Sequence, residues 1–223
     1  MDDTVTDTST TVRADRGLTL KQIDIRLKGE PVIALDAHVA PGEVLTVMGP
    51  SGSGKSTLLN LIAGFLPDAF EASGQILLDG QDITHLPPER RRLGLLFQDA
   101  LLFPHLSVES NLLYALPPGG SRRARCDKVR AFLDEMGMAE LGARDPATLS
   151  GGQKARVALL RVLLAEPHAL LLDEPFSRLD AERRAAVRAF VFDCARKRDL
   201  PVLLVTHDRD DAEAAGGAIT LAG

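Results

Sequence analysis

The stretch Val44–Thr57 reads VLTVMGPSGSGKST and decides the class of fold that the sequence predicts. Its apolar start, Val44–Met48, has the composition of a buried parallel strand, and the apolar-periodic segment LLNLIAGF after it is typical of a helix. A strand, a glycine-rich loop with Lys-Ser at its end and a helix make a P-loop. The loop residues that we expect to bind a nucleotide are Gly49, Pro50, Ser51, Gly52, Ser53, Gly54, Lys55, Ser56 and Thr57.

The rest of the chain predicts an α/β fold around this loop. Leu170–Leu172 and Val202–Val205 are further apolar runs of the kind found in buried parallel strands. Looser patterns at Leu18–Leu27, Val32–Val39 and Gln75–Asp79 predict an antiparallel sheet beside this core. We therefore expect a P-loop NTPase core with a parallel sheet and an antiparallel β subdomain.

A helical insertion is predicted between about residues 100 and 149. Helical periodicity runs through Val108–Leu116 and Arg122–Met136, with a breaker at Pro117–Gly120 and no strand signal. We divide the chain into a flexible polar tail over residues 1–16 and one domain over 17–223. In that domain, 17–99 and 150–223 form the catalytic core, and about 100–149 form the helical subdomain.

Two acids follow an apolar strand at the segment Ala169–Pro175, ALLLDEP. At the end of such a strand, one carboxylate can order Mg²⁺ and the next can orient a water for in-line attack. We assign Asp173 to the metal, through Ser56 and its water shell, and Glu174 to the general base. The alternative is that both acids only cap a helix.

Gln98 and His207 follow two more strand-like segments, Leu93–Phe97 and Val202–Thr206. The carboxyl ends of parallel strands converge on one crevice, so both side chains can reach the γ-phosphate region. Taken alone, a histidine after a strand is more often a hydrogen-bonded structural residue. The surrounding motifs favour the functional interpretation.

A second phosphate-binding element reads LSGGQ, with the residues Leu149, Ser150, Gly151, Gly152 and Gln153. Ser150 is a good N-cap, and the glycines leave backbone amides uncovered at the positive end of the following helix. The element has no lysine, metal ligand or base of its own. We therefore expect it to close over a nucleotide that is held elsewhere.

Bulk properties limit the partners of this chain. The net charge of −5 over 223 residues disfavours nucleic acid, whose binding requires many phosphates to be neutralised. Met1–Arg16 lacks the apolar core of a signal peptide, and no apolar run approaches the roughly 20 residues of a spanning helix. A cytoplasmic protein with a peripheral membrane role is the expectation.

Together GPSGSGKST, LLFQDALLF, LSGGQ, ALLLDEP, SRLD at Ser177–Asp180 and VTHD resemble the ordered motifs of the ABC-transporter nucleotide-binding subunit. The resemblance implies a homodimer packed head to tail, with each ATP between the P-loop of one subunit and LSGGQ of the other. It implies that Gln98 contacts Mg²⁺ or the attacking water and that His207 clamps the γ-phosphate. It also implies that Asp180 belongs to a segment at the dimer interface.

The same resemblance implies a membrane permease that docks near Gln98–Val108. Leu101, Leu102 and Phe103 are too apolar for an exposed loop, which agrees with a docking site; the alternative is that they only pack the helical subdomain. The central stretch is most similar to bacterial thiamine-type importer ATPases and a related group of unestablished solute. This similarity predicts an importer subunit on the cytoplasmic face of the inner membrane, working with a periplasmic solute-binding protein.

Two other functions remain as alternatives: a module of a membrane signalling complex, and a soluble ABC ATPase acting on nucleic acid or ribosomes.

The chain also departs from the family pattern ahead of the P-loop. Members usually carry an aromatic residue there that stacks on adenine, whereas Ile25–Gly29 reads IRLKG and the only tyrosine is Tyr114. With Leu27 as an apolar substitute, we expect relaxed base selectivity.

Overall fold

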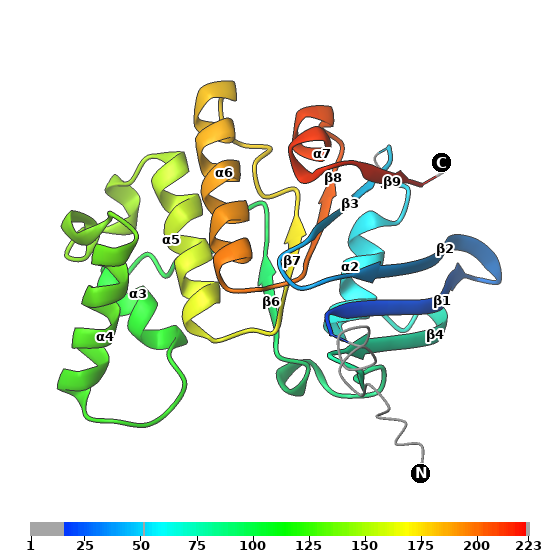
Figure 1. The fold of residues 1–223 in the computed structure, drawn as a ribbon, viewed down its shortest axis with the longest axis horizontal. Helices are drawn as coiled ribbons and strands as arrows, with labels where there is room; N and C mark the ends of the chain where they lie inside the picture. The colour runs from blue at the N-terminus through cyan, green and yellow to red at the C-terminus, as the bar shows by residue number, and fades with distance from the viewer. Residues whose placement is uncertain (1–15, 51, 222–223) are drawn as a thin grey trace, which may run out of the picture.

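A parallel sheet forms the centre of the molecule in the computed structural model, which describes residues 16–50 and 52–221 (Figure 1). Its strands lie in the order β6-β7-β8-β3-β9, and each neighbouring pair is parallel. They are β6 (Leu93–Leu96), β7 (Ala169–Asp173), β8 (Val202–Thr206), β3 (Val44–Met48) and β9 (Ala218–Thr220). The predicted parallel strands are confirmed, and β9 is an addition that the sequence pattern did not indicate.

The predicted antiparallel sheet lies beside the core, in the order β2-β1-β4-β5. It comprises β1 (Leu18–Leu27), β2 (Glu30–Val39), β4 (Phe70–Leu78) and β5 (Gln81–Asp82). Strand β4 starts five residues before the predicted Gln75, because pairing with β1 extends it through Gly74. Gly74 has φ +106°, and a Cβ there would lie 2.5 Å from the Gln22 carbonyl oxygen, so only glycine fits opposite the bulge in β1.

Helices cover the parallel sheet and form the opposite end of the molecule from the antiparallel sheet (Figure 1). Within the described residues, the segment 100–149 contains only helices, 3₁₀ turns and loops, as predicted. The helices are α2 (Lys55–Ala63), α3 (Val108–Ala115), α4 (Arg122–Glu135), α5 (Gly151–Leu164), α6 (Ala181–Lys197) and α7 (Arg209–Ala215). Short 3₁₀ turns lie at Pro88–Arg90, Ala139–Leu141 and Pro146–Thr148.

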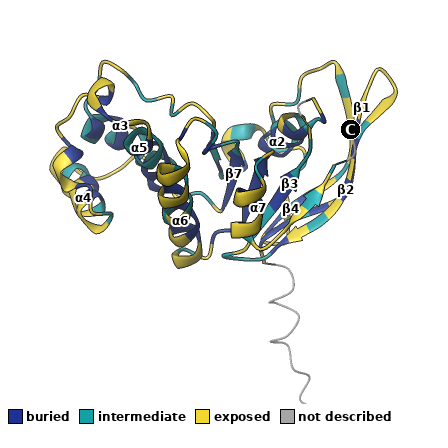
Figure 2. Cartoon of the chain, turned by 90° about the horizontal axis from the view of Figure 1, so that it is seen from above, coloured by how far each residue is buried: buried dark blue, intermediate teal, exposed yellow. Residues whose placement is uncertain are grey.

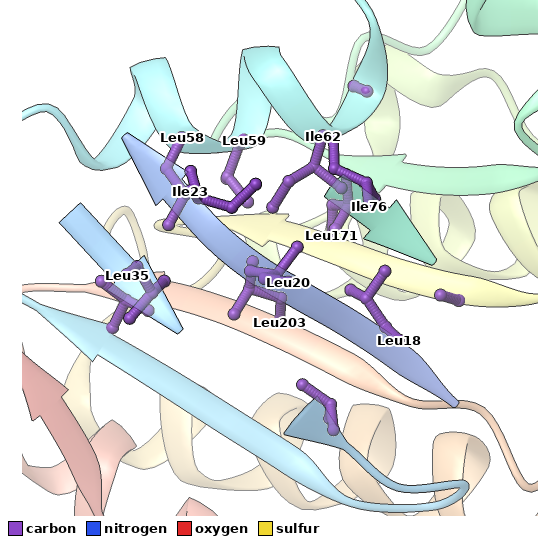
Figure 3. Close-up of a cluster of buried hydrophobic side chains, with 14 of the residues drawn as sticks. Leu18, Leu20, Ile23, Leu35, Leu58, Leu59, Ile62, Ile76, Leu171 and Leu203 are labelled. Carbon is purple, nitrogen blue, oxygen red and sulfur yellow. The ribbon is translucent and has the colours of Figure 1, made fainter. Parts of the chain in front are cut away.

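The two faces of the parallel sheet pack against different layers. On one face, Leu171 and Leu203 pack with helix α2 and the antiparallel sheet (Figure 3). On the other face, Leu170, Leu172 and Leu204 pack with α5 and α6. A further apolar cluster joins α3, α4 and α5, and the outer faces of α4 and α6 are exposed (Figure 2). Helix α5 therefore belongs to the sheet layer and to the helical end at once.

Arg91 ties the end of the P-loop helix to the loop before β6. Its side chain is buried and donates to the carbonyl oxygens of Leu61 and Ile62, in the last turn of α2. It also donates to the carbonyls of Leu86 and Thr84. These contacts satisfy carbonyl groups at a helix end that lacks intrahelical partners.

Arg91→Met should destabilise the fold, because it fills the same space but leaves buried carbonyls without donors. We expect the free energy of unfolding to fall by about 3 kcal/mol. The control is Arg90→Met, which removes the same charge from the exposed neighbour. Thermal melts of both variants check the prediction, and equal melting temperatures would contradict it.

Candidate functional site

The candidate site lies where the carboxyl ends of neighbouring strands meet. Strand β6 leads to Gln98, β7 ends in Asp173, β8 is followed by His207 and β3 by the P-loop. These strands are adjacent in the sheet in the order β6-β7-β8-β3. In the structure these motifs therefore meet at one edge of the sheet, as expected.

A polar cavity of about 400 Å³ opens at this edge. It is lined by Gly52, Gly54, Lys55, Ser56, Thr57, Gln98, Asp173 and Glu174. The wall offers an ammonium, two hydroxyls, an amide and two carboxylates. That donor set fits a phosphate chain together with a divalent cation. Ser51, which we also assigned to this loop, lies outside the described residues.

Tight packing fixes the path of the P-loop. Gly54 has φ +85°, and a Cβ there would lie 2.7 Å from Cγ1 of Val32 in strand β2. The antiparallel sheet therefore abuts the loop. Lys55 is buried, and its Nζ donates to the carbonyl oxygens of Gly49 and Pro50, each at 2.8 Å. These contacts hold the ammonium inside the loop, in the wall of the cavity.

Asp173 faces the P-loop across the cavity. The Ser56 hydroxyl donates to Asp173 Oδ1 at 3.3 Å, so the two side chains predicted to hold the cation lie side by side. Burial raises the pKa of Asp173, and the hydrogen bond from Ser56 opposes this rise. A bound cation would favour the charged form. No cluster of three His, Cys, Asp or Glu side chains that could hold a metal exists in the described part of the chain. Mg²⁺ is commonly held with few protein ligands, together with phosphates and water.

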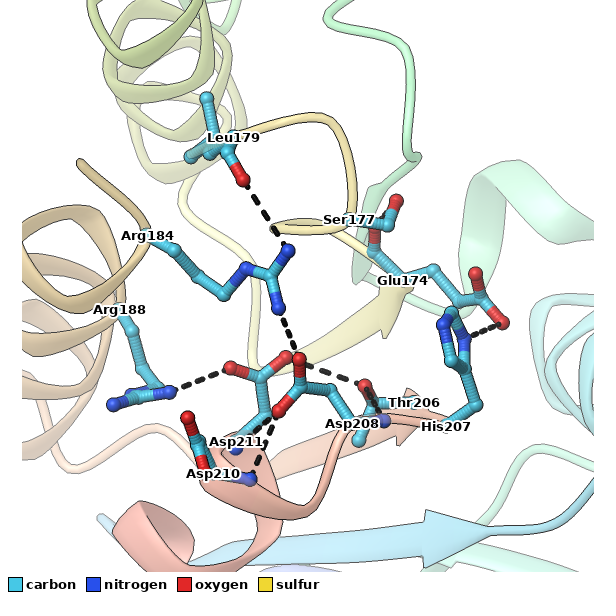
Figure 4. A network of polar contacts seen from close by, with 10 residues as sticks. All are labelled: Glu174, Ser177, Leu179, Arg184, Arg188, Thr206, His207, Asp208, Asp210 and Asp211. Carbon is cyan, nitrogen blue, oxygen red and sulfur yellow. Dashed lines mark hydrogen bonds and ion pairs between the residues drawn. The ribbon is translucent and has the colours of Figure 1, made fainter. Parts of the chain in front are cut away.

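Glu174 and His207 touch each other at the mouth of the site. His207 Nδ1 lies 3.0 Å from Glu174 Oε1 (Figure 4). The Glu174 backbone has φ +45°, a left-handed conformation that is uncommon for glutamate and concentrates at functional sites. Hydrogen bonds hold it there: its amide donates to the Val205 carbonyl, and its carbonyl accepts from the Ser177 hydroxyl.

The LSGGQ segment forms the start of α5, as its sequence predicts. The Ser150 hydroxyl accepts from the Gln153 amide, and the Gln153 side chain accepts from the Ser150 amide, which completes a capping box. Helix α5 begins at Gly151, three residues before the periodic stretch that starts at Lys154. None of Leu149–Gln153 lines the P-loop cavity of the same chain.

Gly151 lines a different cavity, of about 240 Å³. This cavity lies between the segment after β6, the start of α5 and the segment after β7, and shares Gln98 with the P-loop cavity. Arg178 forms an ion pair with Asp99 along its wall. Asp180, in the same segment as Arg178, accepts from the Arg183 amide and caps α6.

Of the three apolar residues Leu101, Leu102 and Phe103, only Leu101 is exposed. Leu101 is 57% exposed and has φ +45°, whereas Leu102 and Phe103 are half-buried. Leu102 packs against the cores of the sheet layer and of the helical end. Leu102 therefore packs the fold, as the alternative interpretation expects, whereas Leu101 faces solvent. The docking site itself stays a prediction.

Two arginines near the site stand in no motif of the sequence. Arg161 of α5 donates to the carbonyl oxygens of Leu101, at 2.7 Å, and Ala100, at 3.2 Å. Arg184 of α6 pairs with Asp208, the residue after His207 (Figure 4). Both contacts join segments far apart in the chain. No local sequence motif predicts these contacts. The one hint in the sequence is that Asp208 directly follows His207, a candidate site residue.

Comparisons with known proteins agree on one family. The family model described as "ABC transporter" matches residues 33–177. The ABC transporter ATP-binding protein YnjD of Escherichia coli (strain K12) is 46% identical over 206 residues, which is 92% of this chain and 95% of that protein. The thiamine import ATP-binding protein ThiQ of Salmonella typhimurium is 48% identical over 175 residues, covering 78% and 73%.

A third relative is longer. The Fe(3+) ions import ATP-binding protein FbpC of Agrobacterium fabrum is 41% identical over 186 residues, which is 83% of this chain but 52% of that protein.

Across residues 16–50 and 52–221, every helix falls short of the length and apolar content that a membrane span requires.

Proposed function

Because the chain belongs to the ABC transporter family of ATP-binding proteins, whose members are ATPases, we propose that it drives a small-solute importer as a homodimer. In this proposal two chains pack head to tail, and ATP-driven closure of the dimer moves a separate membrane permease. Each ATP would lie between the P-loop of one chain and LSGGQ of the other, and the P-loop side of the site would hold Mg²⁺.

The observation that carries the proposal is the separation of the two phosphate-binding elements. The P-loop cavity already holds Lys55, Asp173 and Glu174, but no residue of Leu149–Gln153 lines it. The α5 N-terminus, with its capping box, is a ready-made anion site that lies outside the P-loop cavity. A second copy of the chain would supply the missing half to each site.

We assign the roles in that composite site as follows. Ser56 and Gln98 would hold Mg²⁺ directly, and Asp173 would hold it through water. Glu174 positions or deprotonates the attacking water, while His207 clamps the γ-phosphate. The contact between His207 and Glu174 supports this pairing, because Glu174 belongs to the cavity wall. Asp180 belongs to the segment that crosses to the partner.

Helix α5 offers a direct mechanical link between nucleotide and permease. Its N-terminus carries Ser150, and Arg161 in its last turn holds the exposed Leu101 loop. Fourteen residues of helix span about 21 Å. A force on the Leu101 loop would therefore act through one rigid element on the LSGGQ segment.

The importer class is supported by the names of the relatives, which include thiamine and Fe(3+) import proteins. We infer a periplasmic solute-binding protein in the same complex and a position on the cytoplasmic face of the bacterial inner membrane. Reconstitution with the permease in vesicles tests this function. ATP-dependent uptake of solute is expected; hydrolysis without uptake would favour a signalling complex, and stimulation by nucleic acid or ribosomes would favour the soluble alternative.

Leu101→Asp should uncouple the ATPase from its permease. The residue is exposed and does not line the P-loop cavity, so hydrolysis by the protein alone should stay unchanged. A charge placed in an apolar contact would weaken the complex by about a hundredfold, which is about 2.7 kcal/mol. Co-purification and uptake assays measure the effect. Ala143→Asp, on the exposed surface of the helical part, is the control; equal behaviour of the two variants would contradict the docking site.

We expect the site to discriminate only weakly between the adenine of ATP and the guanine of GTP. Leu27 is 36% exposed at the end of β1, and Val32 of the paired strand contacts the P-loop. Without the roughly 0.5–1.5 kcal/mol that aromatic stacking adds, we expect the kcat/KM values for ATP and GTP to agree within about tenfold. Leu27→Tyr should increase the preference for ATP. A strong preference of the unmodified protein for one of the two nucleotides would count against this expectation.

A further inference from the structure

Arg184 contacts two segments that the proposed function places in the site. It is the fourth residue of α6, and its side chain is about one quarter exposed. One terminal nitrogen pairs with the carboxylate of Asp208, and the other donates to the carbonyl oxygen of Leu179 at 3.2 Å (Figure 4). Leu179 precedes Asp180 in the segment assigned to the dimer interface.

The Asp208 side chain in turn fixes the backbone on which His207 sits. Its Oδ1 accepts from the amides of Asp210 and Asp211 and caps α7, while its own amide donates to the Thr206 hydroxyl. His207 lies between Thr206 and Asp208, so both of its neighbours are held. Displacement of Asp208 would turn the His207 backbone and move its ring relative to Glu174.

We propose that Arg184 is a positioning residue, which transmits the position of the segment Ser177–Asp180 to His207. The inference rests on the proposed function, because it gives His207 its role at the γ-phosphate. A shift of Leu179 on approach of the partner chain would move the guanidinium, and with it Asp208. His207 would reach its place only when the partner is docked.

The chemistry of arginine suits this task better than that of lysine. A guanidinium presents donors in a rigid plane, so its two terminal nitrogens keep Leu179 and Asp208 at a fixed separation. A lysine ammonium on a flexible stem can pair with Asp208 without fixing Leu179. Arg188, one turn further along α6, pairs with the buried Asp211 and anchors the same capped helix.

The test compares Arg184→Gln with Arg196→Gln, a control that removes the same charge from an exposed position on the same helix. ATP affinity and ATP-dependent dimerisation are measured in the Glu174→Gln background, and kcat without it. For Arg184→Gln we expect kcat to fall by up to about a hundredfold with unchanged ATP affinity and dimerisation. Arg184→Lys should recover only part of the loss, and the control should match the unmodified protein.

Histidine NMR provides a readout that a general loss of stability would not reproduce. The chain has five histidines, and His207→Ala identifies the signal of His207. Arg184→Gln and Asp208→Asn should shift this signal and leave the others in place; asparagine preserves the helix cap, so this variant folds even if the first does not. An unmoved His207 signal, or a kcat equal to the control, would overturn the inference. If the unmodified protein hydrolyses no ATP, the proposed function fails. The His207 signal still shows in that case whether Arg184 sets the position of His207.

Discussion

Glu174→Gln should nearly abolish ATP hydrolysis and leave ATP binding intact. The substitution keeps the size of the side chain and its reach toward His207, but removes the carboxylate that would accept a proton from the attacking water. General-base catalysis contributes about 10²- to 10⁴-fold, so kcat should fall within that range. Because Lys55 and the P-loop are untouched, the variant should accumulate as an ATP-bound dimer.

The control for this variant is Glu140→Gln, which removes a carboxylate from the exposed surface of the helical part. Steady-state phosphate release gives kcat, and titration with a fluorescent ATP analogue gives the affinity. If the variant hydrolyses ATP at the rate of the unmodified protein, Glu174 is not the general base. A parallel loss of ATP binding would show that the residue acts on the nucleotide and not on water.

Ser150→Asp should block hydrolysis, whereas Ser150→Asn should have a small effect. Both residues are good N-caps, so both preserve the start of α5 that Ser150 now caps. They differ in one negative charge, which the aspartate would place against the phosphates of the partner's nucleotide. At 4 Å and an effective dielectric constant of 20, this repulsion is about 4 kcal/mol. Dimer closure should weaken by about a thousandfold.

Binding of ATP to the isolated chain separates this effect from simple damage. The P-loop cavity of the same chain has no lining residue from Leu149–Gln153, so neither variant should change its affinity for ATP. Measurements at protein concentrations well below that needed for dimerisation test this point. Equal activity of the two variants, or loss of monomer affinity in step with hydrolysis, would contradict a role at the opposite site.

The parts of the fold and site that the sequence predicts are those with local causes. Val44–Met48 and Ala169–Asp173 are strands because their apolar runs are buried on both faces, and the P-loop and acid pair follow from their spacing along the chain. Convergence of Gln98 and His207 with these motifs follows from the shared direction of parallel strands.

What the sequence missed depends on contacts between distant segments. The start of β4 reads FEASG, in which Glu71, Ala72 and Gly74 are poor strand formers, and pairing with β1 makes it a strand. The contact between Arg161 and Leu101 spans 60 positions, and that between Arg184 and Asp208 spans 24. Such pairs are set by how whole helices pack, and no spacing rule along the chain encodes them.

The central claim, that each chain completes its partner's site, is tested most directly by the mass of Glu174→Gln in solution with ATP. Multi-angle light scattering should find a dimer with ATP, a monomer without it, and a monomer with ATP for the double variant Glu174→Gln/Ser150→Asp. The double variant should still bind ATP. A Glu174→Gln protein that binds ATP and remains monomeric, or a double variant that dimerises as well as the single one, would contradict the account.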